Sequence, residues 1–277
     1  MLLLHIVLVE LLEGMRGTIS HCRSQVKIYG EAYKIGGIVG ESIGGKIEYC
    51  INEDSISGGQ YAGGICGYSN NTFIDACGNR ENAYIETTLG YTGGIVGYVG
   101  SGDGVSEYAV GRCYNYGMVE TSYLIADPTK TKGIATGGIV GGAWNEEGQL
   151  IVIQGCYNMG TVKSLADTIG GILGGTYSLF DETNTSKDKN SIIGCYNLGI
   201  IDSEQANQIS SKYANVTRSY YVTSNQNISG YGIPRKEPEF KANSSISVWR
   251  LLETALPGYW VLNENNNGYV SLSWQNE

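Results

Sequence analysis

Six of the seven cysteines recur along the chain at comparable spacing, so they are the first residues to weigh for chemistry. Thiolates bind zinc or form disulfides, but structural zinc sites need C-x-x-C pairs or histidine partners at short spacing. The sequence offers neither arrangement. The spacing instead predicts a column of free, buried thiols, and a disulfide between neighbouring members stays open. The six are Cys22, Cys50, Cys77, Cys113, Cys156 and Cys195.

Histidines and carboxylates do not form a catalytic pattern. A Ser/His/Asp arrangement would have to use His5 or His21, the only histidines, and no H-E-x-x-H motif occurs. Solenoids that cleave polysaccharides use paired carboxylates as acid and base. The loop acids of this chain fall at unmatched positions, so we expect no catalytic residue. They are Asp103, Asp127, Glu146, Glu147, Asp181 and Glu182.

Two further stretches resemble ligand-binding loops only in part. Gly-Ser-Gly-Asp-Gly at 100–104 lacks the lysine and the following helix of a phosphate-binding loop. The oxygen-rich tract 181–190 departs from the EF-hand spacing at its third and fifth positions and lacks the EF-hand glycine. We therefore expect no cofactor and no bound metal.

The segments that must position these residues are repeats. G-G-I-x-G occurs at 36–40, 63–67, 93–97, 137–141 and 170–174, and Cys-Tyr-Asn occurs at 113–115, 156–158 and 195–197. Aligned on the cysteines, the units follow [IV]-x-x-C-x-N-x-x-x-[IV], with Ser24 at the asparagine position of the first unit and Ala83 at the last apolar position of the third. Cys66 fills the variable position of G-G-I-x-G and is interpreted as a small core residue. Two alternating phrases indicate one structural unit stacked many times.

The units have the composition of short strands. They are rich in β-branched residues, bounded by Gly and Asn, and have no apolar residues at helical spacing. Strands with so many glycines, 41 in 277 residues, are weak unless neighbouring copies pair along their whole length. We therefore predict an all-β fold, a parallel β-solenoid of six to seven repeats with a small C-terminal helix and hairpin cap. Equal positions would stack about 4.8 Å apart, forming columns of thiols, hydrogen-bonded Asn amides and corner glycines.

The G-G-I-x-G phrase conflicts with a flat strand. Ile38 and Val39 should face opposite sides, yet both positions are apolar in all five copies. Either a second layer covers the outer face or the glycines bend the strand.

Composition narrows the function classes. The net charge is −9 and no basic run occurs, which argues against a nucleic-acid surface. The apolar start, Met1–Leu12, lacks the positive region and cleavage site of a signal peptide and is too short to cross a bilayer as a helix. We interpret residues 1–18 as an N-terminal cap or truncated boundary and expect no membrane insertion.

Residues 19–230 carry the predicted repeat array, and residues 231–277 a C-terminal cap. Insertions enlarge four turns, at 98–108, 120–135, 142–150 and 175–190. A degenerate seventh unit is expected to place Val216 and Ser219 in the apolar and cysteine positions. After Pro234 and Pro238, we expect a helix through 247–253 and a hairpin from 260–262 and 269–274, whose tryptophans cover an open end of the solenoid.

The two phrases together resemble the GLUG-motif repeats of bacterial surface proteins, which occur in adhesin-like proteins and beside immunoglobulin A1 metalloprotease domains. The ending Asn267-Gly268-Tyr269 with Leu272 and Trp274 is similar to the segments that close such arrays. The resemblance implies a β-solenoid on a secreted or wall-attached bacterial protein. Since the family is defined by repeats, no catalytic residues carry over.

We therefore expect a non-catalytic structural or adhesive module, extracellular or on the bacterial surface. It would act as a rigid spacer or bind a host or cell-surface protein or glycan through its inserted loops. The alternative is a carbohydrate-binding or carbohydrate-active solenoid. A glycan enzyme would need a groove with two carboxylates about 5–10 Å apart.

Overall fold

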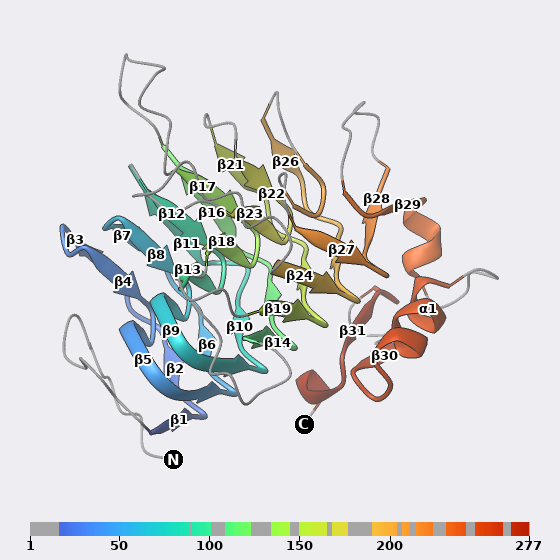
Figure 1. Cartoon of the computed structure of the whole chain (residues 1–277), viewed down its shortest axis with the longest axis horizontal. Coiled ribbons are helices and arrows are strands. Elements are labelled where there is room, and N and C mark those ends of the chain that lie inside the picture. The colour runs from blue at the N-terminus through green and yellow to red at the C-terminus, as the bar shows by residue number, and fades with distance from the viewer. Residues whose placement is uncertain are drawn as a thin grey trace.

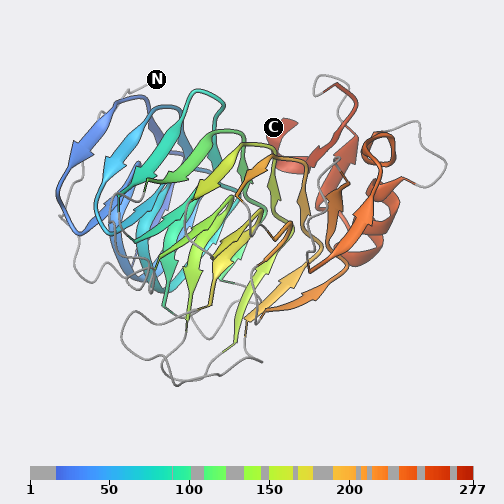
Figure 2. The same cartoon turned by 90° about the horizontal axis from the view of Figure 1, so that it is seen from above.

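Four parallel sheets form the sides of a coil that advances from the N-terminal to the C-terminal end, as Figure 1 shows. Seen from above, the coils lie side by side in sequence order (Figure 2). The predicted parallel solenoid is therefore confirmed. The computed structural model describes residues 17–88, 90–100, 109–122, 134–144, 150–164, 168–176, 190–203, 207–210, 214–223, 231–241, 247–262 and 267–276.

Each sheet gathers one strand position from successive repeats. Sheet A comprises β1 (Thr18–Ser20), β5 (Val39–Glu48), β9 (Cys66–Asp75), β13 (Val96–Val99), β14 (Val110–Gly111), β18 (Val140–Ala143), β19 (Ile151–Gln154), β23 (Leu173–Gly175), β24 (Asn190–Ile193) and β27 (Asn215–Thr217). Sheet B comprises β2 (Arg23–Ser24), β6 (Ile51–Asn52), β10 (Gly78–Asn79), β15 (Tyr114–Asn115), β20 (Tyr157–Asn158), β25 (Tyr196–Asn197), β28 (Tyr220–Val222) and β29 (Ile233–Arg235).

Two smaller sheets complete the coil. Sheet C comprises β3 (Ile28–Gly30), β7 (Ile56–Gly58), β11 (Tyr84–Thr87), β16 (Met118–Thr121), β21 (Val162–Ser164) and β26 (Ile201–Asp202). Sheet D comprises β4 (Lys34–Gly36), β8 (Tyr61–Gly63), β12 (Tyr91–Gly93), β17 (Ala135–Gly137) and β22 (Ile169–Gly170). Asn52 pairs with Asn79 and Asn79 with Asn115, so one repeat makes one full coil.

The G-G-I-x-G phrase forms the corner between sheets D and A. Ile38 and Val39 are both buried in the same core cluster because the chain turns between β4 and β5. The second of the two predicted explanations is thus correct: the glycines bend the chain. In the fourth coil, a Cβ at Gly138 would lie 2.2 Å from the carbonyl oxygen of Gly171. Only glycine allows this approach of neighbouring coils.

A second corner, between sheets A and B, uses a left-handed residue directly before each cysteine. Its φ lies between 47° and 59° in all seven coils, although the residue type varies. These residues are His21, Tyr49, Ala76, Arg112, Gly155, Gly194 and Arg218.

The apolar core follows the predicted columns except in the third and sixth coils. In the third coil the apolar column is filled by Ile85, which pairs with Ile56 and Val119, and not by Ala83. The sixth coil, which lacks a double glycine, places Ile209 in the same core cluster as Ile172, and a bridge pairs Leu173 with Ser210. The degenerate seventh unit is confirmed, because Val216 pairs with Ile192 and Tyr220 with Tyr196.

The C-terminal segment contains the expected helix α1 (Val248–Ala255) and antiparallel hairpin of β30 (Trp260–Leu262) and β31 (Val270–Leu272), with short 3-10 helices at Glu237–Phe240 and Ser273–Asn276. Ser247 caps α1 by accepting a hydrogen bond from the Trp249 amide at 3.2 Å. Among the described helices, none is both apolar and long enough to cross a membrane.

The tryptophans of this segment lie elsewhere than expected. Trp260 and Trp274 pack sideways on a column of tyrosines from successive coils of sheet B, and not over an open end. Tyr157 and Tyr196 of this column stack with ring centroids 4.9 Å apart. Burying these rings stabilises several coils at once, since one segment spans them.

Candidate functional site

The cysteine column is structural. All seven cysteines are free, and five of the six column members are fully buried. Each column thiol donates to the carbonyl two residues before it, as Cys113 Sγ does to Gly111 O at 3.0 Å. Ser219 makes the same bond to Thr217 O at 3.0 Å, so the seventh coil keeps the donor with a different atom. This bond closes the left-handed corner described above.

Burial also makes these thiols poor nucleophiles. Desolvation, followed by hydrogen bonding to Cys113, raises the pKa of Cys77 well above its ordinary value. Burial raises the pKa of Cys66, in the G-G-I-x-G phrase, to about 12. The predicted core role of Cys66 is confirmed, since it pairs with Val39 and Val96 and has no exposed surface.

The asparagine column is a continuous chain of amide hydrogen bonds. Asn79 donates to Asn115 at 2.7 Å, and Asn115 donates to Asn158 at 2.8 Å. The chain continues through Asn197, which donates to Gln208 at 3.1 Å. At its N-terminal end Asn52 Oδ1 is buried and has no hydrogen-bond partner, because Ser24 occupies the first position of the column.

The residues considered above for metal binding and acid–base chemistry are scattered where the structure describes them. Among them, no three His, Cys, Asp or Glu side chains gather closely enough to hold a metal ion. His21 is exposed and stacks on Tyr49 with centroids 5.0 Å apart. His5, the six loop acids named above, the loop at 101–104 and the tract 181–189 lie outside the described residues.

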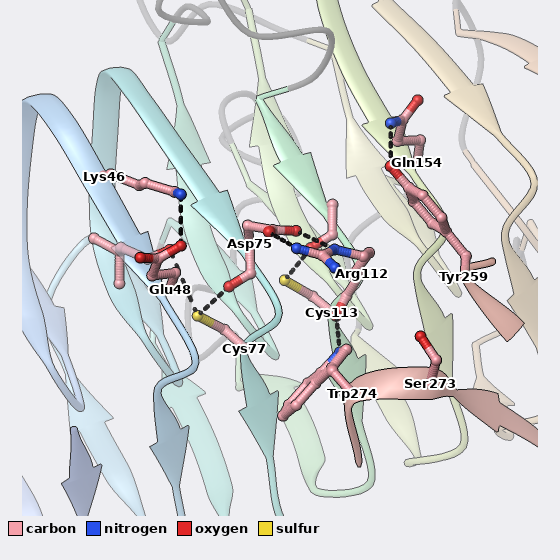
Figure 3. A network of polar contacts seen from close by, with 12 residues as sticks. Lys46, Glu48, Asp75, Cys77, Arg112, Cys113, Gln154, Tyr259, Ser273 and Trp274 are labelled. Atoms are coloured by element: carbon pink, nitrogen blue, oxygen red, sulfur yellow. Dashed lines mark hydrogen bonds and ion pairs between the residues drawn. The ribbon is translucent and has the colours of Figure 1, made fainter. Parts of the chain in front are cut away.

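A polar network joins the outer row of sheet A to the C-terminal segment, as Figure 3 shows. Arg112 pairs with the almost fully buried carboxylate of Asp75, with Nε 2.9 Å from Oδ1. Gln154 donates to the Tyr259 hydroxyl at 3.1 Å, and Trp274 Nε1 donates to Arg112 O at 2.8 Å. The ion pair with Asp75 orients Arg112, whose guanidinium lies over the Tyr259 ring at 5.7 Å and so contacts the C-terminal segment.

Three of the four inserted segments emerge from equivalent positions of sheet A, whereas the fourth, 120–135, connects β16 of sheet C to β17 of sheet D. Strands β5 and β9 run without interruption for ten residues each. In the next coil the same path is divided between β13 and β14, which both pair with β9. The fourth and fifth coils divide it between β18 and β19 and between β23 and β24. Three insertions in consecutive coils therefore leave one face, about 4.8 Å apart at their attachments.

A groove of about 560 Å³ lies at the corner between sheets C and D in the first coils. Its outward row on sheet C runs from Tyr29 to Ser57 and Glu86, which are Cα partners in consecutive strands. Glu86 accepts hydrogen bonds from Ser57 at 3.2 Å and Ser122 at 2.7 Å. The groove is lined by Tyr29, Gly30, Glu31, Tyr33, Ser57, Gly58, Gly59, Gln60, Glu86 and Thr88.

Sequence reasoning did not single out these lining residues. They belong to no shared motif, because each coil contributes different side chains to this corner. The one available sequence signal was the pair Tyr29 and Tyr33, which precedes the first G-G-I-x-G phrase and does not belong to the repeated motif.

Comparison with known proteins identifies the fold but no family. No protein-family model matches the sequence, and no curated protein matches it. The chain is similar to a crystal structure from Bacteroides ovatus provisionally identified as an immunoglobulin A1 protease. The TM-score is 0.59 and the identity 17%, over 91% of this chain and 78% of the other. This likeness supports a shared fold and is compatible with the predicted GLUG resemblance, which no family match confirms.

Proposed function

We propose that this chain is a non-catalytic structural and adhesive module of a secreted or cell-surface bacterial protein. The solenoid is a rigid support, and the inserted segments bind a host or cell-surface protein or glycan. One observation carries the proposal: three consecutive coils interrupt the same strand path of sheet A with insertions.

Rigidity follows from the interior. The Cys, Asn and apolar columns bond or pack with their counterparts in the coils on either side. A close-packed interior has low compressibility, and segments carried by such a rigid support are common binding elements. The function thus needs variation in the insertions but constancy in the columns.

The uninterrupted strands suggest a direct test. Val99 pairs with Ser69 and Val110 with Ile74, so residues 100–109 can be replaced by residues 70–73 of β9. Equivalent replacements remove residues 144–152 and 177–191. Beads coated with the full chain are then tested for adhesion to surfaces carrying mucin, immunoglobulin A1 or epithelial cells. Variants with Ser-Gly sequences of unchanged length at 101–108, 145–149 and 177–189 are the matched controls for loop length.

We expect the parent to adhere to one of these surfaces and at least one replacement to reduce adhesion about tenfold without loss of cooperative unfolding. The matched Ser-Gly variant should lose adhesion equally, because binding depends on loop sequence. Unchanged adhesion of a variant that lacks these three insertions and carries a Ser-Gly sequence at 123–133, in the fourth inserted segment, would refute the adhesive role. Since the structural neighbour is provisionally identified as an immunoglobulin A1 protease, cleavage of immunoglobulin A1 by the purified chain is assayed in parallel and would refute the non-catalytic role.

A further inference from the structure

The groove between sheets C and D has two exposed aromatic side chains. Tyr29 is 84% exposed and Tyr33 is 49% exposed. The Tyr33 ring meets Tyr61 edge-on at 5.2 Å, and Tyr61 stacks on Tyr91 at 5.7 Å. This contact fixes the Tyr33 ring, so a ligand that stacks on it does not have to pay for ordering a free side chain.

Three of the lining residues are glycines. Gly58 and Gly59 have φ values of 114° and 74°, which L side chains rarely adopt. A Cβ at Gly58 would lie 1.8 Å from the carbonyl oxygen of Gly30. Coils one and two therefore approach closely along this part of the groove, where Gly58 and Gly59 expose only backbone atoms.

The polar lining suits hydroxyl groups. Gln60 offers both an amide donor and an acceptor, Ser57 and Thr88 offer hydroxyls, and Glu31 offers a carboxylate. Among the residues that the structure describes, no lysine or arginine lines the groove, so an anionic ligand would face two carboxylates without a counter-charge there. The Glu86 oxygens already accept two hydroxyl hydrogen bonds, which makes this residue a weaker partner for a cation.

We infer that this groove binds a neutral oligosaccharide. Tyr33 and Tyr29 stack against the apolar faces of sugar rings, and Gln60 and Glu31 hydrogen-bond sugar hydroxyls. Its volume lies in the range of small-molecule binding sites. The groove lies in the first three coils, whereas the three insertions removed in the adhesion test leave sheet A, so this inference and the proposed function can fail independently.

The test is isothermal titration calorimetry, in which the full chain is titrated with neutral hexasaccharides of glucan, galactan and mannan. An acidic oligogalacturonate and an oligolysine peptide probe the competing ligand classes. Tyr33→Ala and Tyr29→Ala remove the rings, and Tyr33→Phe keeps the ring without its hydroxyl. The matched control is Tyr231→Ala, which removes an exposed tyrosine outside the groove.

We expect one neutral hexasaccharide to bind, with affinity reduced about tenfold by each groove Tyr→Ala change and retained by Tyr33→Phe and Tyr231→Ala. Tyr29→Ala is the decisive variant, because the Tyr29 side chain is so exposed that its removal does not unfold the coil. The inference is overturned if no neutral hexasaccharide binds at about 10 mM, a concentration above most weak affinities. It is also overturned if oligogalacturonate or oligolysine binds more tightly, or if Tyr29→Ala and Tyr33→Ala leave the affinity unchanged.

Discussion

Replacing Asn115 by alanine tests whether the amide column holds the coils together. Asn115 accepts from Asn79 at 2.7 Å and from the Gly117 amide at 3.1 Å, and donates to Gly117 O at 2.9 Å and to Asn158 at 2.8 Å. A buried hydrogen bond contributes about 1 kcal/mol net, so losing all four should lower the free energy of unfolding by about 4 kcal/mol.

Two further alanine variants separate bond number from position. Asn52 donates two hydrogen bonds, to Asp54 O at 2.7 Å and to Asn79 at 2.8 Å, and its Oδ1 has no partner. Asn52→Ala should therefore cost about 2 kcal/mol, half the Asn115 value. Asn197 lies near the other end of the column but makes bonds of all four kinds, so Asn197→Ala should cost about 4 kcal/mol.

Urea denaturation followed by circular dichroism gives the three free energies directly. Equal losses for Asn52→Ala and Asn115→Ala would refute the reasoning, because cost would then not follow bond number. A loss below about 1 kcal/mol for Asn115→Ala would refute it as well, since that is about the net contribution of a single hydrogen bond and four are removed.

Three other changes test neighbouring features. Ser24→Asn should supply the missing donor to Asn52 Oδ1 and raise the free energy of unfolding by about 1 kcal/mol, measured by the same urea titration; a loss of stability would contradict the register. Gly138→Ala places a Cβ 2.2 Å from a carbonyl oxygen and should cost more than about 3 kcal/mol, whereas Gly17→Ala, with nothing within 4 Å, should cost little by the same measurement. Thiol labelling with Ellman's reagent at pH 8 should modify Cys22 alone in the folded chain and all seven cysteines in denaturant, because the other six thiols are fully buried. Burial also raises the pKa of Cys77 and Cys113 well above the ordinary value, and fast labelling of several thiols would contradict the column.

The columns could be predicted because their side-chain types repeat. Each Cys, Asn and Ile contacts the equivalent residue in the next coil, so the same side-chain type is needed at that position in every repeat. The same logic could have located the hidden sixth corner, since Ile209 follows Cys195 at nearly the spacing that separates Ile172 from Cys156. The two replaced glycines concealed it.

Other features left no pattern to recognise. The left-handed residue before each cysteine is a backbone requirement that His, Tyr, Ala, Arg and Gly all meet, so its side chains vary. The groove joins unlike residues of three coils. The sideways packing of Trp260 and Trp274 depends on the tyrosine column offering a broad apolar surface, which a linear sequence does not place beside the chain end.

The left-handed corner has a consequence for the length of the molecule. Only the fifth and sixth corners carry glycine, and there a Cβ would lie 2.6 Å from Tyr259 Cδ2 at Gly155 and 2.8 Å from Leu256 Cδ1 at Gly194. The returning chain end therefore packs at one fixed position, against the corners of the fifth and sixth coils. Extra repeats added ahead of the second coil would leave these contacts, and those of Trp274 with Tyr49 and Arg112, intact, while one added behind Gly194 would separate the chain end from them. Repeat duplication can thus lengthen such a protein on its N-terminal side without displacing the chain end from its packing surface.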